Sequence, residues 1–167
     1  DMASLAMGSF NFRDGPSITT VDEIEQLATL IRDAGIVPEL EVFDLGMAAM
    51  AQRLVDRGIV KERPYANLIL GSVNTAPADA RSMLALVDAL PSQTTWAAAG
   101  LGSFQQTANA LAVFVGGHVR TGLEDNPDRP DGQPADNQWL VERAVTLAES
   151  AGRPLATTDQ ARAMIGI

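Results

Sequence analysis

The protein has 167 residues, of which 46% are hydrophobic and 20% charged, so it can bury one sizeable core and fits one domain or a large piece of one. The formal net charge of −9, with no basic patch to offset it, argues against binding to nucleic acid or to an anionic membrane surface. The lack of cysteine excludes disulfides and thiolate metal sites, and the lack of a membrane-length apolar run or a basic N-terminal signal predicts a cytoplasmic protein.

Short β-like runs alternate with amphipathic stretches along the chain. Thr20, with Glu23 three residues later, matches a helix N-cap, and Gly35, Gly58 and Gly152 stand where helices should stop. The pattern is a strand followed by a helix, repeated about five times. In chain order we predict strands at 2–7, 37–43, 67–71, 95–99 and 117–121, and helices at 21–34, 47–57, 77–89, 103–114, 137–151 and 158–164.

This alternation predicts a parallel sheet, either doubly wound or closed into a barrel. No GxGxxG motif joins a strand to a helix, which disfavours a doubly wound dinucleotide-binding fold. Polar residues inside the second strand favour a barrel, because a doubly wound sheet is buried on both faces. We therefore predict an α/β fold of the (β/α)8 barrel type. Alternation along 38–44 places Glu39, Glu41 and Phe43 on one strand face, opposite Leu40, Val42 and Asp44.

Five βα units cannot close an eight-stranded barrel, which typically needs roughly 250 residues. About three further units are expected before Asp1, because the chain opens directly on a strand-like run. Residues 1–167 are thus predicted to be the C-terminal part of a single barrel domain. A partial barrel exposes sheet edges, so we also expect a homo-oligomer.

The chemically reactive side chains concentrate in residues 116–126, GGHVRTGLEDN. If the strand continues to Leu123, then His118 and Arg120 point the same way. Glu124 and Asp125 follow at the carboxyl end, where barrel enzymes place catalytic groups. An arginine beside two carboxylates is costly to bury unless the charges pair or bind something, so a structural ion-pair network and a catalytic centre both remain open.

His118 is the sole histidine of the sequence. On an extended strand it would lie about 20 Å from Glu124, far beyond the reach of a shared zinc ion. We therefore interpret His118 as a core residue or a residue outside the metal's ligand set. Any metal site at Glu124 would need imidazoles from elsewhere.

Several motifs, agreeing in order and spacing, resemble the β-keto acid cleavage enzymes: MASLAMGSFNF, PELEVFDLGM, TTWAAAGLG, GGHVRTGLEDN and GRPLATTDQARAMIG. The resemblance runs along essentially the entire chain. It implies a (β/α)8 barrel that binds a divalent metal, usually zinc. It also implies condensation of a β-keto acid with acetyl-CoA, which yields acetoacetate and a new acyl-CoA.

Matched by position, the resemblance makes Glu124 the metal-binding carboxylate, with two partner histidines in an HxH motif on a barrel strand that this chain lacks. Arg120 and Asp125 match the pair that removes the α-proton of the keto acid. Because a guanidinium is a poor base in water, we interpret Asp125 as tuning or relaying through Arg120. Glu41 matches an acid that orients Arg120 or the substrate. Ser4 matches a hydroxyl that helps to hold the substrate carboxylate, although an ordinary polar strand end is the alternative for this residue.

Three departures from the family pattern limit what the resemblance implies. Residues 71–76 replace a Gly-Gly turn, and Ser103 stands where many members carry arginine, which leaves the acyl-CoA contacts open. Ala6 stands where many members have a polar residue, which leaves the keto-acid side chain open. Two hypotheses therefore remain: a metal-dependent acyltransferase that cleaves a carbon–carbon bond, and a non-catalytic barrel or fragment. The intact residues Arg120, Glu124 and Asp125 favour the first.

Overall fold

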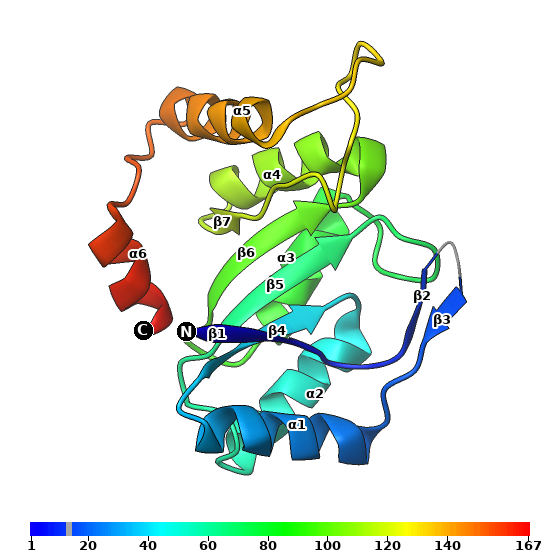
Figure 1. Cartoon of the computed structure of the whole chain (residues 1–167), viewed down its shortest axis with the longest axis vertical. Helices are drawn as coiled ribbons and strands as arrows, with labels where there is room; N and C mark the ends of the chain where they lie inside the picture. The colour runs from blue at the N-terminus through cyan, green and yellow to red at the C-terminus, as the bar shows by residue number, and fades with distance from the viewer. Residues whose placement is uncertain (13–14) are drawn as a thin grey trace.

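Parallel strands form the main sheet of the protein, which a computed structural model describes over residues 1–12 and 15–167. Their order across the sheet is their order along the chain (Figure 1). A βα barrel has this consecutive order, whereas a doubly wound sheet reverses direction at a switch point. The predicted α/β fold of the barrel type is therefore confirmed. The strands are β1 (Met2–Ala6), β4 (Val37–Val42), β5 (Tyr65–Leu70), β6 (Thr95–Gly100) and β7 (His118–Val119).

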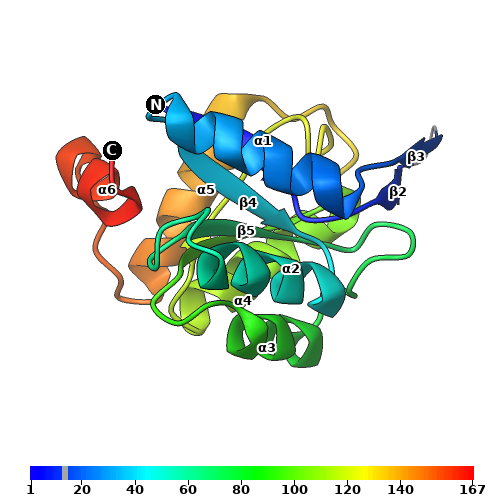
Figure 2. The ribbon, with the colours of Figure 1, turned by 90° about the horizontal axis from the view of Figure 1, so that it is seen from below.

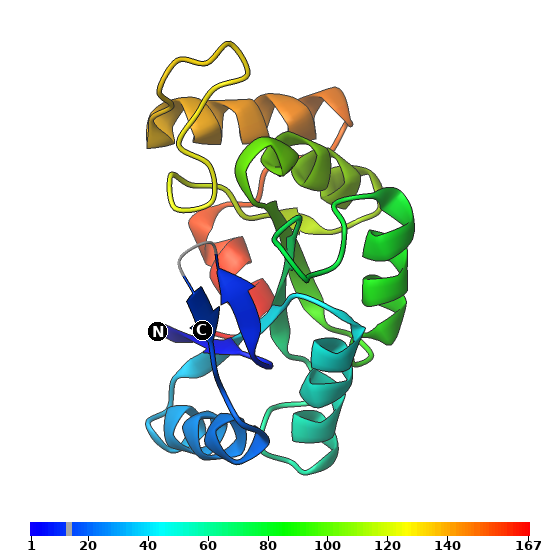
Figure 3. The same ribbon diagram turned by 90° about the vertical axis from the view of Figure 1, so that its right-hand side faces the viewer.

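The helices that follow the strands lie on one side of the sheet. The first four succeed one another in an arc around the strands, as the outer layer of a barrel does (Figure 3). Within 1–12 and 15–167, no helix is long and apolar enough to cross a membrane. The helices are α1 (Val21–Asp33), α2 (Leu45–Asp56), α3 (Ala80–Ala89), α4 (Gln105–Phe114), α5 (Asn137–Ser150) and α6 (Thr158–Ile165), with a short 3-10 turn at Gly102–Phe104 before α4.

Helix α6 lies apart from this arc, beside both chain termini (Figures 1 and 2). Its Arg162 Nη1 is 3.0 Å from the Oδ2 atom of Asp1, just before β1. The Thr95 hydroxyl, at the start of β6, donates to the Met164 carbonyl at 3.2 Å. Helix α6 therefore contacts the amino ends of the strands, which is the end of the sheet opposite to the expected catalytic end.

The two faces of the sheet differ in polarity, because successive strand residues point to opposite faces. One face packs under the helices and is apolar, with Leu40, Val42 and Leu68 fully buried in the core. The other face is polar: the pairing register aligns Glu41 of β4 with Asn67 of β5. The acids that the sequence placed on one strand face thus lie on the inner face of the curved sheet.

Side-chain caps decide where several helices begin. Thr20 and Glu23 form the predicted capping box of α1, with the Glu23 carboxylate accepting from the Thr20 backbone N–H at 2.7 Å. The prediction for Asp44 was wrong: it is not a strand residue but the N-cap of α2, accepting from the Met47 N–H at 2.9 Å. Asp79 caps α3, and this helix therefore begins at Ala80, three residues after the predicted start at 77.

Two further differences concern strands. The short antiparallel pair β2 (Phe10–Phe12) and β3 (Gly15–Ser17) was not predicted; the Phe10 ring stacks on Phe43 at 4.0 Å between centroids. The prediction that the last strand reaches residue 121 or 123 was wrong, because β7 ends at Val119. Beyond it the Arg120 N–H still donates to the Ala98 carbonyl at 3.1 Å, and a turn follows.

Candidate active site

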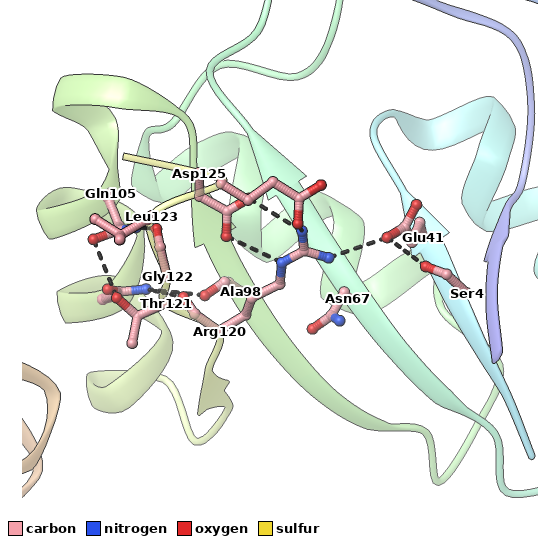
Figure 4. A network of polar contacts seen from close by, with 12 residues as sticks. Ser4, Glu41, Asn67, Ala98, Gln105, Arg120, Thr121, Gly122, Leu123 and Asp125 are labelled. Carbon is pink, nitrogen blue, oxygen red and sulfur yellow. Dashed lines mark hydrogen bonds and ion pairs between the residues drawn. The ribbon is translucent and has the colours of Figure 1, made fainter. Parts of the chain in front are cut away.

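Arg120 is the centre of an ion-pair network on the inner face of the sheet, next to the end of β7 (Figure 4). Its Nε and Nη2 atoms donate to the two carboxylate oxygens of Asp125, each at 3.1 Å. Its Nη1 atom donates to Glu41 Oε1 at 3.0 Å across the sheet from β4. The Arg120 and Glu41 side chains are 20% and 17% exposed, and that of Asp125 only 4%. These pairs are therefore shielded from solvent far more than ordinary surface salt bridges.

Ser4 joins the network through Glu41. The Ser4 hydroxyl donates to Glu41 Oε1, the same oxygen that accepts from Arg120, at 2.7 Å. Strand β1 places Ser4 beside β4, because the two strands pair in parallel with Ser4 opposite Glu39. The structure thus joins Ser4, Glu41, Arg120 and Asp125 into one continuous chain of hydrogen bonds.

The guanidinium of Arg120 stays protonated in this setting. Partial burial by itself lowers its pKa, but the hydrogen bonds and charges of Asp125 and Glu41 outweigh burial and raise the pKa above its ordinary value. A guanidinium has no hydrogen-bond acceptor. Arg120 is therefore a fixed positive charge and a hydrogen-bond donor rather than a base.

Glu124 lies at the edge of the network. It is 88% exposed, and its Oε2 atom is 3.4 Å from Arg120 Nη2, which leaves the carboxylate free to turn toward another partner. Among the residues that the structure describes, no three His, Cys, Asp or Glu side chains are close enough to hold a metal ion together. Glu124 can supply one hard oxygen ligand to a metal ion.

The sole histidine lies away from Glu124 on β7. His118 pairs with Ala97 of β6 and is half-buried. Burial, together with the nearby charge of Arg153, lowers the pKa of its imidazole. His118 takes no part in the hydrogen-bond chain from Ser4 to Asp125.

A second polar cluster, missed by the sequence predictions, lies beside the first on the inner face. The Asn67 amide donates to Glu39 Oε1, and the Tyr65 hydroxyl donates to Asn67 Oδ1 at 3.3 Å. Asn67 is 1% exposed. Burial and the charge of Glu39 raise the pKa of Tyr65 to about 12, so its hydroxyl stays neutral. The prediction began β5 at residue 67 and so lost Tyr65; the polar residues at alternate positions 65 and 67 were the available signal.

Glu39 should make the stability of the fold depend on pH. Burial raises its pKa above the unfolded value of 4.5, against the lowering effect of Arg120. Its stabilising contribution is therefore complete below about pH 4.5 and is lost as pH rises through the higher folded pKa. We expect Glu39→Gln to become progressively more stable relative to the wild type as pH rises from 5 toward 8. Urea unfolding across this range measures the difference.

Glu62→Gln is the matched control, because Glu62 is exposed before β5. Its stability relative to the wild type gives the pH dependence that the same change produces at an exposed position. A Glu39→Gln difference that varies with pH no more than this control would contradict the raised pKa of Glu39.

Comparison with known proteins agrees with this architecture. The family model of the beta-keto acid cleavage enzymes matches residues 1–167. A 3-keto-5-aminohexanoate cleavage enzyme of Fusobacterium nucleatum is 37% identical over 169 residues, which are 100% of this chain and 61% of the relative. A 3-oxoadipate:acetyl-CoA acetyltransferase of Cupriavidus necator is 38% identical over 173 residues, covering 100% of this chain and 60% of the relative.

The fold also matches a solved structure. The apo structure of ObcA superposes with a TM-score of 0.75 at 19% identity, over 99% of this chain and 44% of that chain. The chain thus spans about three fifths of the length of the curated relatives and less than half of the ObcA chain. Because the family model matches from the first residue to the last, the chain belongs to the β-keto acid cleavage enzyme family.

Proposed function

We propose that the protein containing this chain is a metal-dependent β-keto acid cleavage enzyme. It condenses a β-keto acid with acetyl-CoA: the acyl group of the keto acid passes to CoA, and the acetyl group joins the remaining carboxymethyl group as acetoacetate. The relatives named for a 3-keto acid and for acetyl-CoA support this reaction class. The observation that carries the proposal is the shielded Arg120–Asp125 pair, tied to Glu41 on the inner face of the sheet.

Arg120 has one donor left for a substrate. A guanidinium carries five N–H groups. Four of them are used in contacts with described residues: two with Asp125, one with Glu41 and one with Glu124. The remaining N–H, on Nη1, is available to an oxygen of the keto acid, where negative charge develops once the α-carbon loses its proton. Preorganised donors at such an oxyanion are a major source of catalysis.

Because Arg120 stays protonated and only donates, we propose that Asp125 itself accepts the α-proton, in place of the relay through Arg120 expected from the sequence. Its carboxylate is nearly fully buried, which limits competition from water. Both of its oxygens accept from Arg120, so one of these hydrogen bonds would have to open before Asp125 takes up the proton. Glu41 keeps the guanidinium in place from the other side. The single O–H of Ser4 is donated to Glu41, so Ser4 would have to turn from Glu41 to hold the substrate carboxylate.

Glu124 fits as one ligand of a divalent metal, which we propose to be Zn²⁺ completed by two histidines of the whole protein. Such an ion polarises carbonyl oxygens when it is bound. The exposed position of Glu124, beside Arg120 but held by one long contact, leaves its carboxylate available to the metal.

If Glu124 is a metal ligand, its substitution should change zinc content and turnover but not the melting temperature of the metal-free protein. In the whole protein, Glu124→Gln should lower zinc content and acetyl-CoA-dependent turnover together, because a carboxamide is a poorer ligand than a carboxylate. Its melting temperature without metal should stay close to that of the wild type, since the side chain is 88% exposed. Elemental analysis and thermal unfolding measure these quantities. Full zinc stoichiometry in Glu124→Gln would remove this residue from the site.

The test of the proposed function is direct. The whole protein, loaded with zinc, should form acetoacetate from acetyl-CoA and at least one member of a panel of β-keto acids with different side chains. Loss of acetoacetate formation after chelation, and recovery after zinc is restored, would support metal dependence. A metal-loaded protein that forms no acetoacetate with any member of the panel would favour the non-catalytic alternative.

We further propose that residues 1–167 are the C-terminal part of one barrel domain in a cytoplasmic homo-oligomer. Strands β1 and β7 are the two edges of the described sheet, and unpaired edges in soluble folds are normally covered by other elements. Light scattering of the whole protein determines its oligomeric state.

A further inference from the structure

Two buried side-chain amides on α4 contact the segment that follows β7. Gln105 is 0% exposed and Asn109 is 2% exposed. They are four residues apart on the helix, so they lie on the same face, one turn from each other. A buried amide is costly unless its hydrogen bonds are satisfied. The hydrogen bonds of these two amides therefore show which parts of the chain they hold in place.

Asn109 ends the pairing between β6 and β7. Its Nδ2 atom donates to the carbonyl oxygens of Ala98 and Arg120, each at 3.0 Å. The Arg120 N–H donates to the same Ala98 carbonyl at 3.1 Å. The Asn109 amide thus bridges the two strands at the last backbone pairing and holds the main chain of the arginine that carries the ion pairs.

Gln105 holds the next part of the segment. Its Nε2 atom donates to the Gly122 carbonyl at 3.3 Å, and its Oε1 atom accepts from the Thr121 hydroxyl at 3.1 Å and from Arg143 Nη2 at 2.9 Å (Figure 4). The Gly122 carbonyl also accepts from the Asp125 N–H at 3.2 Å. Gln105 is therefore bonded to the oxygen on which the turn closes, and that turn brings Asp125 back to Arg120.

We propose that Asn109 and Gln105 are positioning residues that set the distance between the Arg120 guanidinium and the Asp125 carboxylate. Neither side chain contacts the ion-pair network itself. Each acts through main-chain carbonyls of the segment 120–122. The expected effect on kcat rests on the proposed function, whereas the expected effect on the contact between Arg120 and Asp125 does not.

The first experiment is kinetic and uses the whole protein. Asn109→Ala should lower kcat by about 100-fold, the loss expected when reacting groups are misplaced by roughly 1 Å. KM for acetyl-CoA and for the keto acid should change little, because Asn109 does not face the open inner side of the sheet. Gln106→Ala is the matched control, because Gln106 is exposed on the same helix. A folded Asn109→Ala enzyme with the kcat of the control would overturn the inference.

The second experiment does not depend on activity. The Nε–H of Arg120 is hydrogen-bonded to Asp125, so its exchange with solvent, followed by NMR, reports the contact directly. Asn109→Ala and Gln105→Ala should each accelerate this exchange by at least about tenfold, as local opening does. The backbone amide of Leu68, in the core strand β5, should keep its protection. Acceleration at Leu68 to the same extent would mean general destabilisation and would overturn the positioning role.

The two experiments separate the inference from the proposed function. If the wild type forms no acetoacetate but Arg120 exchange responds as expected, the positioning role stands and the proposed reaction fails. If the wild type is active but neither kcat nor Arg120 exchange responds in Asn109→Ala, the positioning role is wrong and the proposed reaction stands.

Discussion

Asp125→Asn should lower kcat of the whole enzyme by roughly two to four orders of magnitude, the range typical of a positioned acid or base. The substitution keeps the size of the side chain but removes the negative charge and one acceptor. It also turns an NH₂ group toward Arg120, which offers only donors. Zinc content should stay near the wild-type value, because Asp125 is not the proposed ligand. Single-turnover kinetics and elemental analysis on the same preparation test both statements.

Asp88→Asn is the matched control, because Asp88 is exposed on α3 and remote from the network. It should leave kcat unchanged. An Asp125→Asn enzyme with full turnover would remove Asp125 from the mechanism. If Asp125→Asn mainly lowered the melting temperature and the folded fraction kept full turnover, the Arg120–Asp125 pair would be a structural ion pair.

Arg120→Lys should lose both turnover and stability although it keeps the positive charge. One ammonium group cannot reproduce the two-pronged contact with Asp125 and also reach Glu41 on another strand. Loss of a hydrogen bond to a charged group costs about 1.5–3 kcal/mol, so we expect a decrease of this order in the free energy of unfolding. We expect kcat to fall by at least about 100-fold, because the oxyanion donor is misplaced.

Arg120→Met extends this test by removing the charge. The 4% exposed Asp125 carboxylate would then be buried without a partner, and loss of one partner of a buried pair costs about 3–5 kcal/mol. Urea unfolding should therefore rank the wild type above Arg120→Lys, and Arg120→Lys above Arg120→Met. Arg81→Lys, at an exposed position on α3, is the control and should match the wild type. Equal stability of all four proteins would show that the network contributes nothing to the fold.

The sequence by itself determined the features that depend on neighbouring residues. Hydrophobic periodicity predicted the order of the parallel strands and the helices, since the direction of side chains repeats every two residues in a strand and every 3.6 in a helix. The capping box at Thr20 and Glu23 was predictable because both partners lie within one turn. Alternation likewise placed Glu39 and Glu41 on one face of their strand. The motifs along the chain predicted the family, which the match over residues 1–167 confirms.

The tertiary structure decided how the predicted site residues meet. Glu41 and Arg120 are 79 positions apart in sequence, and only the pairing of strands in a curved sheet brings them to 3.0 Å. Local pattern also could not predict that β7 ends at Val119. The next carbonyl after the strand, that of Arg120, accepts from the Asn109 side chain on the preceding helix. Strand propensity takes no account of this long-range contact and therefore favoured a longer strand.

Because β7 ends at Val119, a turn follows it, and this turn brings Asp125 into contact with Arg120. An extended strand would have carried the carboxylate away from the guanidinium by about 3.3 Å per residue. In the structure the turn closes on the Gly122 carbonyl, which the buried Gln105 amide also contacts. The closure of the turn, from the Asp125 N–H to the Gly122 carbonyl, is local, whereas the Gln105 contact joins residues 17 positions apart, which no local pattern reveals. The composition of the site could therefore be predicted from the sequence, but its geometry was set by long-range packing of α4 against the end of the sheet.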